Sequence, residues 1–486
     1  MKKKGSITVY LLLFLSTLLL LLGAVLLSAR YQGARAIVKA AARQSMFDLF
    51  SRYDSVLFQE YDLLFMEAGF GASQFRPGLM LDCMEKNAGI LWGENSSATN
   101  LWGLGECQAV LHSYTLATDQ EGEAFYRQAV QVGQSVVAKD ALYLVKEQIN
   151  LSSRQKKTGE TQADVKEACD KYQDAVEKAQ EGEMEKGTGK DAEGSKDDAA
   201  EKIKDNPIET IKKLQKKGIL GLVMPADATM SQKKVQSSSL LSGRKKEQGI
   251  GLVSAAQSHK TTDHLQFDRY LVSHLSSFVS PGEKAALSWQ LEYVIGGKKS
   301  DKENLKKTVE ALLLLREGAN LMYLKQDAAS MAKVRTMAAS ISAALAVPVG
   351  EELIAGVLCV CWAYGESLED VRTLLAGGKV PLTKDRTTWK LSLKELSAVG
   401  NKRAQKDSQG QKGLTYTAYL ELLLGMKADQ DCLSRGMDMV ETGMRSRPGS
   451  DTFSLDHCVH AVEAEIRTTV KGIGSISAKE YRSYEN

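Results

Sequence analysis

The sequence lacks the residue usage that marks several classes of protein. Its seven cysteines are too few, and odd in number, for a disulfide scaffold. Lys plus Arg total 63 against 60 for Asp plus Glu, a net charge of +3, so no broad basic field for nucleic acid is expected. With 43% hydrophobic and 25% charged residues, the composition excludes a collagenous or wholly disordered chain. At 486 residues we expect more than one domain.

The sequence also lacks the common catalytic and nucleotide-binding motifs, including a P-loop, G-x-G-x-x-G, H-E-x-x-H, G-x-S-x-G and an EF-hand loop. Two S-x-x-K matches, at 231–234 and 330–333, are short enough to arise by chance in a chain this rich in Ser and Lys. The single metal-like cluster, 456–460 (DHCVH), has no second cluster to complete a tetrahedral site. We therefore predict a structural thiol and surface histidines there, and we assign no catalytic residue, metal site or cofactor.

A long apolar run near the N-terminus is the strongest positive signal. Three lysines at 2–4 precede the uncharged stretch 7–27, whose 21 residues would form a helix about 31 Å long. That length spans the hydrocarbon core of a bilayer and exceeds the roughly 7–15 apolar residues of a cleaved secretory signal. The sequence therefore predicts a transmembrane helix.

The helical pattern continues beyond the apolar run. Between residues 6 and 58 there is no proline, so we expect one transmembrane helix that continues into a stalk over 6–58. The second half is either a stalk packed on its own domain or a spine that packs against copies of itself. Its apolar stripe is Val38, Ala42, Met46, Leu49, Tyr53 and Val56, at steps of three and four.

Charge alone barely distinguishes the two orientations of this helix. The basic residues 2–4 face four others on the far side of the span, within about 20 residues. A short basic tail before a first span favours a cytoplasmic N-terminus, with the bulk of the chain extracellular. An alternative is a secreted protein cleaved after Ala36, because Ala34-Arg35-Ala36 imitates a signal-peptidase site.

The segment GSITVY and the apolar run that follows it resemble the N-terminus of TadE/TadG-type pseudopilins from tight-adherence pilus loci. The resemblance implies a basic leader, 1–5, that a peptidase would cut between Gly5 and Ser6. It also places Tyr10 where that family usually has Glu, a carboxylate expected to pair with a neighbouring amino terminus during assembly. Tyr10 cannot form that pair, so an uncleaved anchor stays open beside a cleaved pseudopilin.

The whole chain also resembles an uncharacterised family of membrane-anchored proteins of clostridial-type bacteria, often associated with such loci. That family has no established activity, so the resemblance implies location and association only. The matching segments are YDLLFMEAG, NPIETIKKLQKKGILGLVMP, LEYVIGGKKSDKENL, WAYGESLEDVRTLLAGGKVPL and GLTYTAYLELLL.

The remaining chain predicts an α+β fold dominated by helix, a mixed ectodomain with a small sheet. We divide it into a first ectodomain part at 59–153, a charged low-complexity insertion at 154–205 and the main α+β ectodomain at 206–486. Residues 72–110 look loop-rich. Strands are expected at 61–71, 218–225, 289–295 and 462–470, and helices at 119–150, 164–180, 301–324, 328–346, 353–364, 368–375, 416–426 and 432–444.

Two cysteine pairs stand out. Cys359 and Cys361 lie two apart on an apolar helix and should point in different directions as buried thiols. If the domain is extracellular, Cys83 with Cys107 is the best candidate for a bridge.

These observations favour a non-enzymatic, single-pass surface protein that belongs to a Tad-type pilus or secretion apparatus, as a minor pseudopilin-like subunit or an assembly factor. Its expected partners are the lipid bilayer and, through the N-terminal helix, other pilus or secretion subunits, but not nucleic acid. The alternative is a membrane-tethered enzyme or binding receptor whose site is assembled from distant residues.

Overall fold

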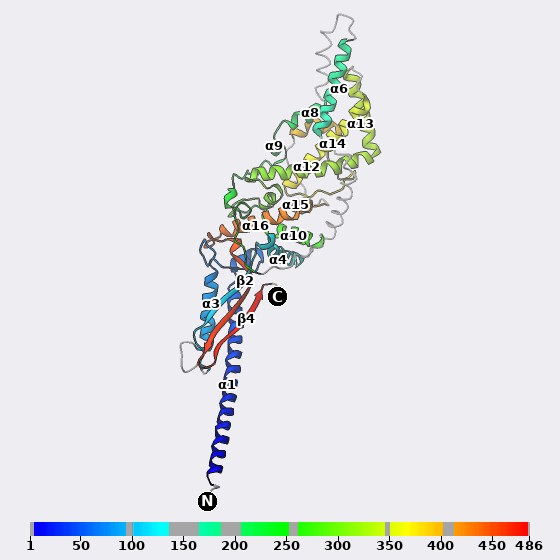
Figure 1. The fold of residues 1–486 in the computed structure, drawn as a ribbon. Helices are drawn as coiled ribbons and strands as arrows, with labels where there is room; N and C mark the ends of the chain where they lie inside the picture. Colours follow the sequence, from blue (N-terminus) through cyan, green and yellow to red (C-terminus); the bar gives the residue numbers. More distant parts are fainter. Residues whose placement is uncertain are drawn as a thin grey trace. The chain divides into compact units, whose positions relative to one another are not determined.

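A computed structural model describes residues 4–93, 100, 102–135, 165–185, 206–251, 261–345, 350–401 and 413–484 (Figure 1). The chain divides into two units, and two of its four crossings between them fall within helices α10 (Thr261–His274) and α16 (Asp429–Arg445). Unit 1 comprises Met1–Ser135, Ser237–Phe267 and Met437–Asn486, and unit 2 comprises Val136–Gln236 and Asp268–Gly436.

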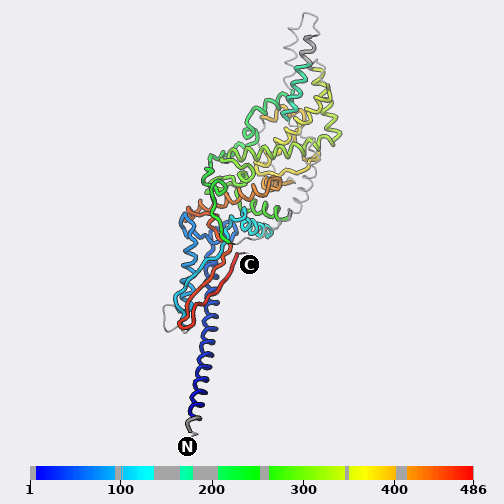
Figure 2. The backbone as a smooth tube through the Cα atoms, in the orientation of Figure 1, coloured from blue at the N-terminus to red at the C-terminus, as the bar shows by residue number. Residues whose placement is uncertain are grey.

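Helix α1 (Lys4–Phe50) starts unit 1 and runs without interruption for 47 residues (Figure 2). It contains no proline, and Leu and Ala, both strong helix formers, supply much of its length. It is long and apolar enough to cross a membrane, and no other helix in the described residues passes that test. The expected membrane-length helix is therefore present.

Helix α1 ends earlier than expected. The prediction of one continuous helix to residue 58 is wrong. Residues 52–54 are not helical, and α2 (Ser55–Tyr61) begins after Asp54. The Asp54 side chain accepts hydrogen bonds from the backbone N–H groups of Val56 and Leu57, both at 2.9 Å. An Asp that caps a new helix in this way competes with continuation of the preceding one.

An antiparallel sheet forms the centre of unit 1. Its strands are β1 (Met66–Glu67), β2 (Gln108–Leu116), β3 (Cys458–Val470) and β4 (Gly474–Ser483). β3 is the central strand and pairs with the other three. Its pairing with β2 runs from Gln108↔Arg467 to Leu116↔Val459, with register shifts between Leu111 and Ser113 and between Thr115 and Leu116. The predicted alternation along 462–470 is confirmed, since its even-numbered residues are buried.

The second half of α1 and helix α3 (Pro77–Trp92) share one apolar core with this sheet. The α1 residues Ala34, Val38 and Leu49 are all 0% exposed. The stripe predicted from the sequence is therefore buried within its own domain as far as Phe50. Helix α3 and strand β2 correct the expectation that 72–110 is loop-rich. Helix α4 (Glu123–Ser135) lies at the start of the helix expected at 119–150, and the rest of that range lies outside the described residues.

Unit 2 is helical in its described residues and is organised around α14 (Glu351–Leu375). This helix is buried almost all round from Ile354 to Leu375, as expected for a core helix, but the two helices predicted at 353–364 and 368–375 are one. α14 packs against α12 (Asp301–Gln326) and α13 (Ala328–Leu345). Ser300 caps the start of α12, because its Oγ accepts a hydrogen bond from the backbone N–H of Glu303 at 3.3 Å.

Two predicted strands of unit 2 are wrong. Residues 219–223 form the short helix α9 (Ile219–Val223), and α11 (Gln290–Gly296) replaces the strand at 289–295. Further helices in the described part of unit 2 include α6 (Val165–Glu185), α8 (Pro207–Gln215) and α15 (Tyr416–Leu424), of which α6 and α15 match predicted helices. The rest of the charged segment 154–205 lies outside the described residues. Helix dominates and the small sheet is antiparallel, so the predicted α+β class is confirmed.

Candidate functional site

The first half of α1, residues 7–27, is apolar and exposed within the described structure, and we call it the apolar rod. From Ile7 to Leu27 its large apolar side chains are between 47% and 74% exposed, at Leu15 and Leu20 respectively. Exposure of so many Leu, Ile, Val and Phe side chains to water would be very unfavourable, because a soluble monomer rarely exposes an apolar patch of more than a few hundred Å². The rod needs an apolar surrounding, and its length matches a bilayer.

The residues singled out near the N-terminus lie at the start of this rod. Gly5 and Ser6 are within α1, one and two residues after its first residue. Tyr10 follows in the same helix and is 72% exposed. The structure therefore places the expected leader junction and the Tyr10 position on one continuous helix.

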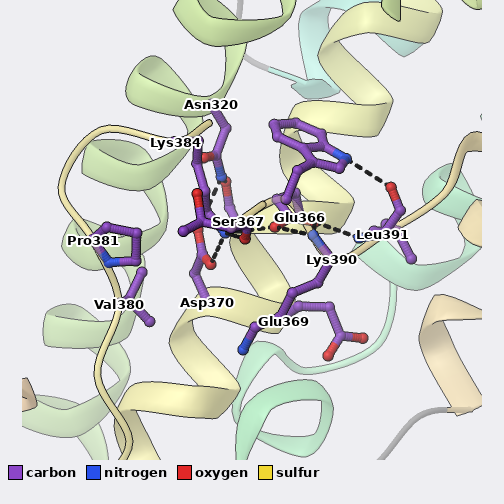
Figure 3. Close-up of polar contacts among 12 residues, drawn as sticks. Asn320, Glu366, Ser367, Glu369, Asp370, Val380, Pro381, Lys384, Lys390 and Leu391 are labelled. Atoms are coloured by element: carbon purple, nitrogen blue, oxygen red, sulfur yellow. Dashed lines mark hydrogen bonds and ion pairs between the residues drawn. The ribbon is translucent and has the colours of Figure 1, made fainter. Parts of the chain in front are cut away.

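A buried charged cluster lies inside unit 2 (Figure 3). Lys384 Nζ is 2.5 Å from Glu366 Oε1 and 2.7 Å from Asp370 Oδ1, and all three side chains are at most 1% exposed. Arg316, which is also fully buried, pairs with Asp370 Oδ2 at 2.9 Å. Glu366 and Asp370 are four residues apart on α14, so they occupy one face of the helix. We call Arg316, Glu366, Asp370 and Lys384 the α14 charge cluster.

Burial and charge act in opposite senses on the two carboxyls of the cluster. Burial raises the pKa of Glu366, and the attraction of Lys384 does not fully offset it. Burial also acts to raise the pKa of Asp370, but Arg316 and Lys384 outweigh it, so that pKa lies below its ordinary value. Asp370 is thus held ionised between two cations. Both carboxylates are committed to ion pairs and are not positioned to act on a ligand.

The cluster also positions the segment 384–391. Glu366 accepts backbone hydrogen bonds from Lys390 at 3.0 Å and from Leu391 at 2.7 Å. The carbonyl of Leu391 in turn accepts the indole N–H groups of Trp362 at 2.8 Å and Trp389 at 2.7 Å. A chain of hydrogen bonds therefore connects the buried charges to two tryptophans.

Those tryptophans line a cleft of about 930 Å³ between one face of α13, Trp362 of α14 and residues 386–394. We call it the α13 cleft. Its aromatic wall is made of Tyr323, Trp389 and Trp362, with successive ring centroids 5.2 and 5.4 Å apart. Its charged residues are Asp327, Lys333, Arg386, Lys390 and Lys394, and Arg386 pairs with Asp327 at 2.9 Å.

The serines of the two S-x-x-K matches donate to carboxylates instead of to a lysine. Ser330 Oγ donates to Asp327 Oδ2 at 2.7 Å, at the start of α13. Ser231 Oγ donates to the carboxylate of Asp301. These hydroxyls stabilise local structure, so the geometry gives no support to a serine nucleophile activated by lysine.

The 456–460 cluster is integrated into the core of unit 1. Asp456 accepts a hydrogen bond from Arg244 at 2.8 Å, and burial raises the pKa of the Cys458 thiol well above its ordinary value. The prediction of surface histidines is wrong, because His457 and His460 are only 6% and 8% exposed. No group of three or more potential metal ligands is found among the described residues.

The described cysteines form no disulfide, so the predicted bridge between Cys83 and Cys107 is absent from this structure. Cys359 and Cys361 face different partners, in line with the divergence expected on a helix. Cys359 lies beside Met331, with sulfur atoms 3.5 Å apart, and Cys361 lies 3.8 Å from the sulfur of Cys169 on α6.

Glu292 of α11 is another buried carboxyl, and no pattern in the sequence indicates it. Its Oε1 accepts hydrogen bonds from the Phe278 N–H at 2.8 Å and the Tyr416 hydroxyl at 2.7 Å. Burial raises its pKa to about 7, although both hydrogen bonds oppose the shift. It has no cation partner in the described residues, and its surroundings give it a structural role.

This raised pKa predicts a pH-dependent stability. In the unfolded chain Glu292 ionises near pH 4.5, whereas in the folded chain it retains its proton until about pH 7. The free energy of unfolding should therefore fall by about 3 kcal/mol as pH rises through that window. Urea unfolding of Glu292→Gln should lack this fall. The surface variant Glu310→Gln should retain it, and an unchanged slope in Glu292→Gln would contradict the assignment.

Comparison with known proteins places this architecture in a family. A family model described as "Family of unknown function (DUF5702)" matches residues 197–470, more than half of the chain. No curated protein and no solved structure matches the chain. The matched range contains the α14 charge cluster, the α13 cleft and strand β3, but not α1.

Proposed function

Given that the chain belongs to DUF5702, a family of unknown function, we propose that it is a non-enzymatic, single-pass membrane protein of the cell surface and a component of a Tad-type pilus or secretion apparatus. Its N-terminus is cytoplasmic and the bulk of the chain extracellular. One observation carries the proposal: α1 is exposed and apolar over Ile7–Leu27, and from Ala34 onward one face of the same unbroken helix is buried in the core of unit 1.

This division of one helix supports an anchor over a cleaved signal. A cut after Ala36 would separate the buried Ala34 from the core that it fills, whereas a cut between Gly5 and Ser6 would leave the core of unit 1 untouched. The anchor and its domain then form one rigid element, which suits a subunit that docks to other helices within the membrane. The resemblance of residues 1–35 to TadE/TadG pseudopilins is the reason for proposing a Tad-type apparatus.

N-terminal sequencing of the protein from isolated membranes and from sheared surface fibres tests this proposal. Ser6 as the first residue indicates pseudopilin processing, and Met1 indicates an uncleaved anchor. Ile37 as the first residue, or recovery in the soluble cytosolic fraction, would contradict membrane anchoring. Recovery in membranes without co-purifying pilus or secretion subunits would contradict the assignment to a Tad-type apparatus, but not the membrane anchoring.

A binding receptor is the second candidate function, because the α13 cleft combines an aromatic wall with several cations. Lys333 and Lys394 are exposed at its edge and suit an anionic ligand with a flat ring or sugar face. Titration with phosphorylated sugars should change the fluorescence of the cleft tryptophans. Lys333→Gln/Lys394→Gln should weaken the response and Lys379→Gln should not. The absence of any response would remove the receptor from consideration.

A further inference from the structure

Just beyond the apolar segment 7–27, α1 makes its first contacts with the rest of unit 1. Arg30 lies three residues, or about 4.5 Å, beyond Leu27. Its Nε donates to the backbone carbonyl of Trp102 at 3.2 Å. One turn later, a side chain on Gly33 would meet the indole of Trp102 at 2.2 Å, so the tryptophan packs directly against α1. Trp102 therefore lies within about two helical turns of the end of the apolar run.

The turn between β3 and β4 lies at the same level. The backbone N–H of Lys471 donates to the carbonyl of Gly103 at 3.2 Å, next to Trp102. Lys471 is exposed, and Ile473 is half-buried against the core of unit 1. The turn therefore places a cationic residue, Lys471, next to the neighbour of Trp102, and an apolar residue, Ile473, two positions further along the chain.

The C-terminal end of α3 supplies two exposed aliphatic residues. Ile90 is 69% exposed and Leu91 is 50% exposed, while Trp92 beside them is buried in the core. Figure 1 shows α3 ending at the same end of the sheet as the β3–β4 turn, the end from which the first half of α1 extends. The exposed Ile and Leu pair therefore faces the side of unit 1 on which the apolar rod emerges.

We propose that Arg30, Ile90, Leu91, Trp102, Lys471 and Ile473 form a lipid-binding rim, which rests on the headgroup layer of the bilayer that α1 spans. The occupant is a lipid surface because the rim is continuous with the apolar rod. Its composition also matches a membrane interface, where aliphatic side chains enter the acyl boundary, Trp sits among the headgroups and Lys and Arg contact lipid phosphates.

The rim gives unit 1 a defined orientation on the membrane. A single span held only by α1 could tilt freely, since the length of an apolar segment does not set its tilt. Contacts from α3 and from the β3–β4 turn add two points of support beside α1. The anionic phosphate that Arg30 and Lys471 recognise belongs to the lipid headgroup, which adds favourable electrostatic attraction in membranes rich in acidic lipid.

This inference depends on the membrane anchoring proposed above, so the experiment measures both separately. The full chain, carrying Cys83→Ser to remove the half-buried thiol, is reconstituted into vesicles that contain phosphatidylglycerol. An environment-sensitive fluorophore is attached to a single introduced cysteine at Ile90, with matched positions at Leu18 and Phe47. Leu18 reports the span, and Phe47, 52% exposed on α1, lies about 30 Å beyond Leu27.

Spin-labelled lipids then quench the fluorophores according to depth. We expect deep labels to quench position 18, headgroup-level labels to quench position 90 and neither to quench position 47. Lys471→Glu should reduce the quenching at position 90. Quenching at position 18 with none at position 90 would contradict the lipid-binding rim but not membrane anchoring through α1. No quenching at either position would contradict both proposals. Equal quenching at 90 in neutral and acidic vesicles, with no effect of Lys471→Glu, would overturn the role of the cations.

Discussion

Replacing Lys384 by methionine is expected to lower the free energy of unfolding of unit 2 by about 3–5 kcal/mol, the largest effect of any single substitution considered for this chain. Lys384 balances two carboxylates that have no access to water. Without it Glu366 loses its cation and must either remain charged in an apolar interior or take up a proton, and both cost free energy. Arg316 still pairs with Asp370, so the loss concentrates on Glu366.

Urea unfolding of the detergent-solubilised full chain measures this effect. The indole N–H groups of Trp362 and Trp389 donate to the backbone carbonyl of Leu391, and the backbone N–H of Leu391 donates to Glu366. The fluorescence of the two tryptophans therefore reports on the cluster. Lys379→Met, in the same loop but exposed, is the matched control and should change stability by about 0.5 kcal/mol at most. A similarly small effect of Lys384→Met would show that the cluster contributes little.

The double variant Glu366→Gln/Lys384→Met provides a further check. It removes the unpaired charge along with the lysine, while the Gln oxygen can still accept from the backbone of 390–391. It should therefore be more stable than Lys384→Met alone, with a coupling of about 1–3 kcal/mol in a double-mutant cycle. Additive effects of the two substitutions would indicate that the ion pair is not an energetic unit.

Placing arginines at Leu15 and Leu19 is expected to abolish membrane integration of α1. Near the centre of a span, exchange of Leu for Arg costs about 3–4 kcal/mol per residue on insertion scales, so two exchanges cost about 6–8 kcal/mol. Resistance to extraction from membranes at alkaline pH measures the outcome. The matched control is Ala36→Arg/Ala40→Arg, which has the same spacing on exposed positions of the second half of α1 and should leave the protein in the membrane.

The two pairs of substitutions distinguish a bilayer anchor from a soluble helix. If the Leu15→Arg/Leu19→Arg protein resists extraction as well as the control, α1 does not hold the protein in the bilayer. If both double variants are extracted, the loss arises from damage to unit 1 and not from the anchor.

The sequence was most informative where one pattern extended over many residues. The apolar run 7–27 and the stripe through Val38 and Ala42 needed only helical periodicity and the absence of proline. Short apolar runs were ambiguous, because a segment such as 219–223 satisfies both a buried strand and a buried helix, and tertiary packing decided for helix. The end of α1 depended on Asp54, whose capping role emerges only with the backbone geometry around it.

The α14 charge cluster was missed for a different reason. Glu366 and Asp370 interrupt an apolar segment. The pattern predicts a break between two helices at 365–367, so Glu366 falls in the break and Asp370 in the second predicted helix. Their four-residue spacing was an available signal, since it places both carboxylates on one face of a continuous helix. Lys384, by contrast, reaches them from a loop, and no local pattern in the sequence indicates where that loop lies. The α13 cleft likewise depends on the packing of α13 beside residues 386–394.

The order in which unit 1 is synthesised follows from its discontinuous sequence. The second half of α1 packs against β3 and β4, and the Tyr484 hydroxyl donates to the Phe50 carbonyl at 2.9 Å. Roughly 400 residues separate α1 from these strands, on the order of 20–80 s of translation. During that interval helix α3 can already pack against the apolar face of α1, but the part of this face that contacts β3 and β4 stays uncovered. A ribosome that stalls before residue 458 would leave a nascent chain with part of this apolar face exposed, a feature that chaperones and proteases recognise.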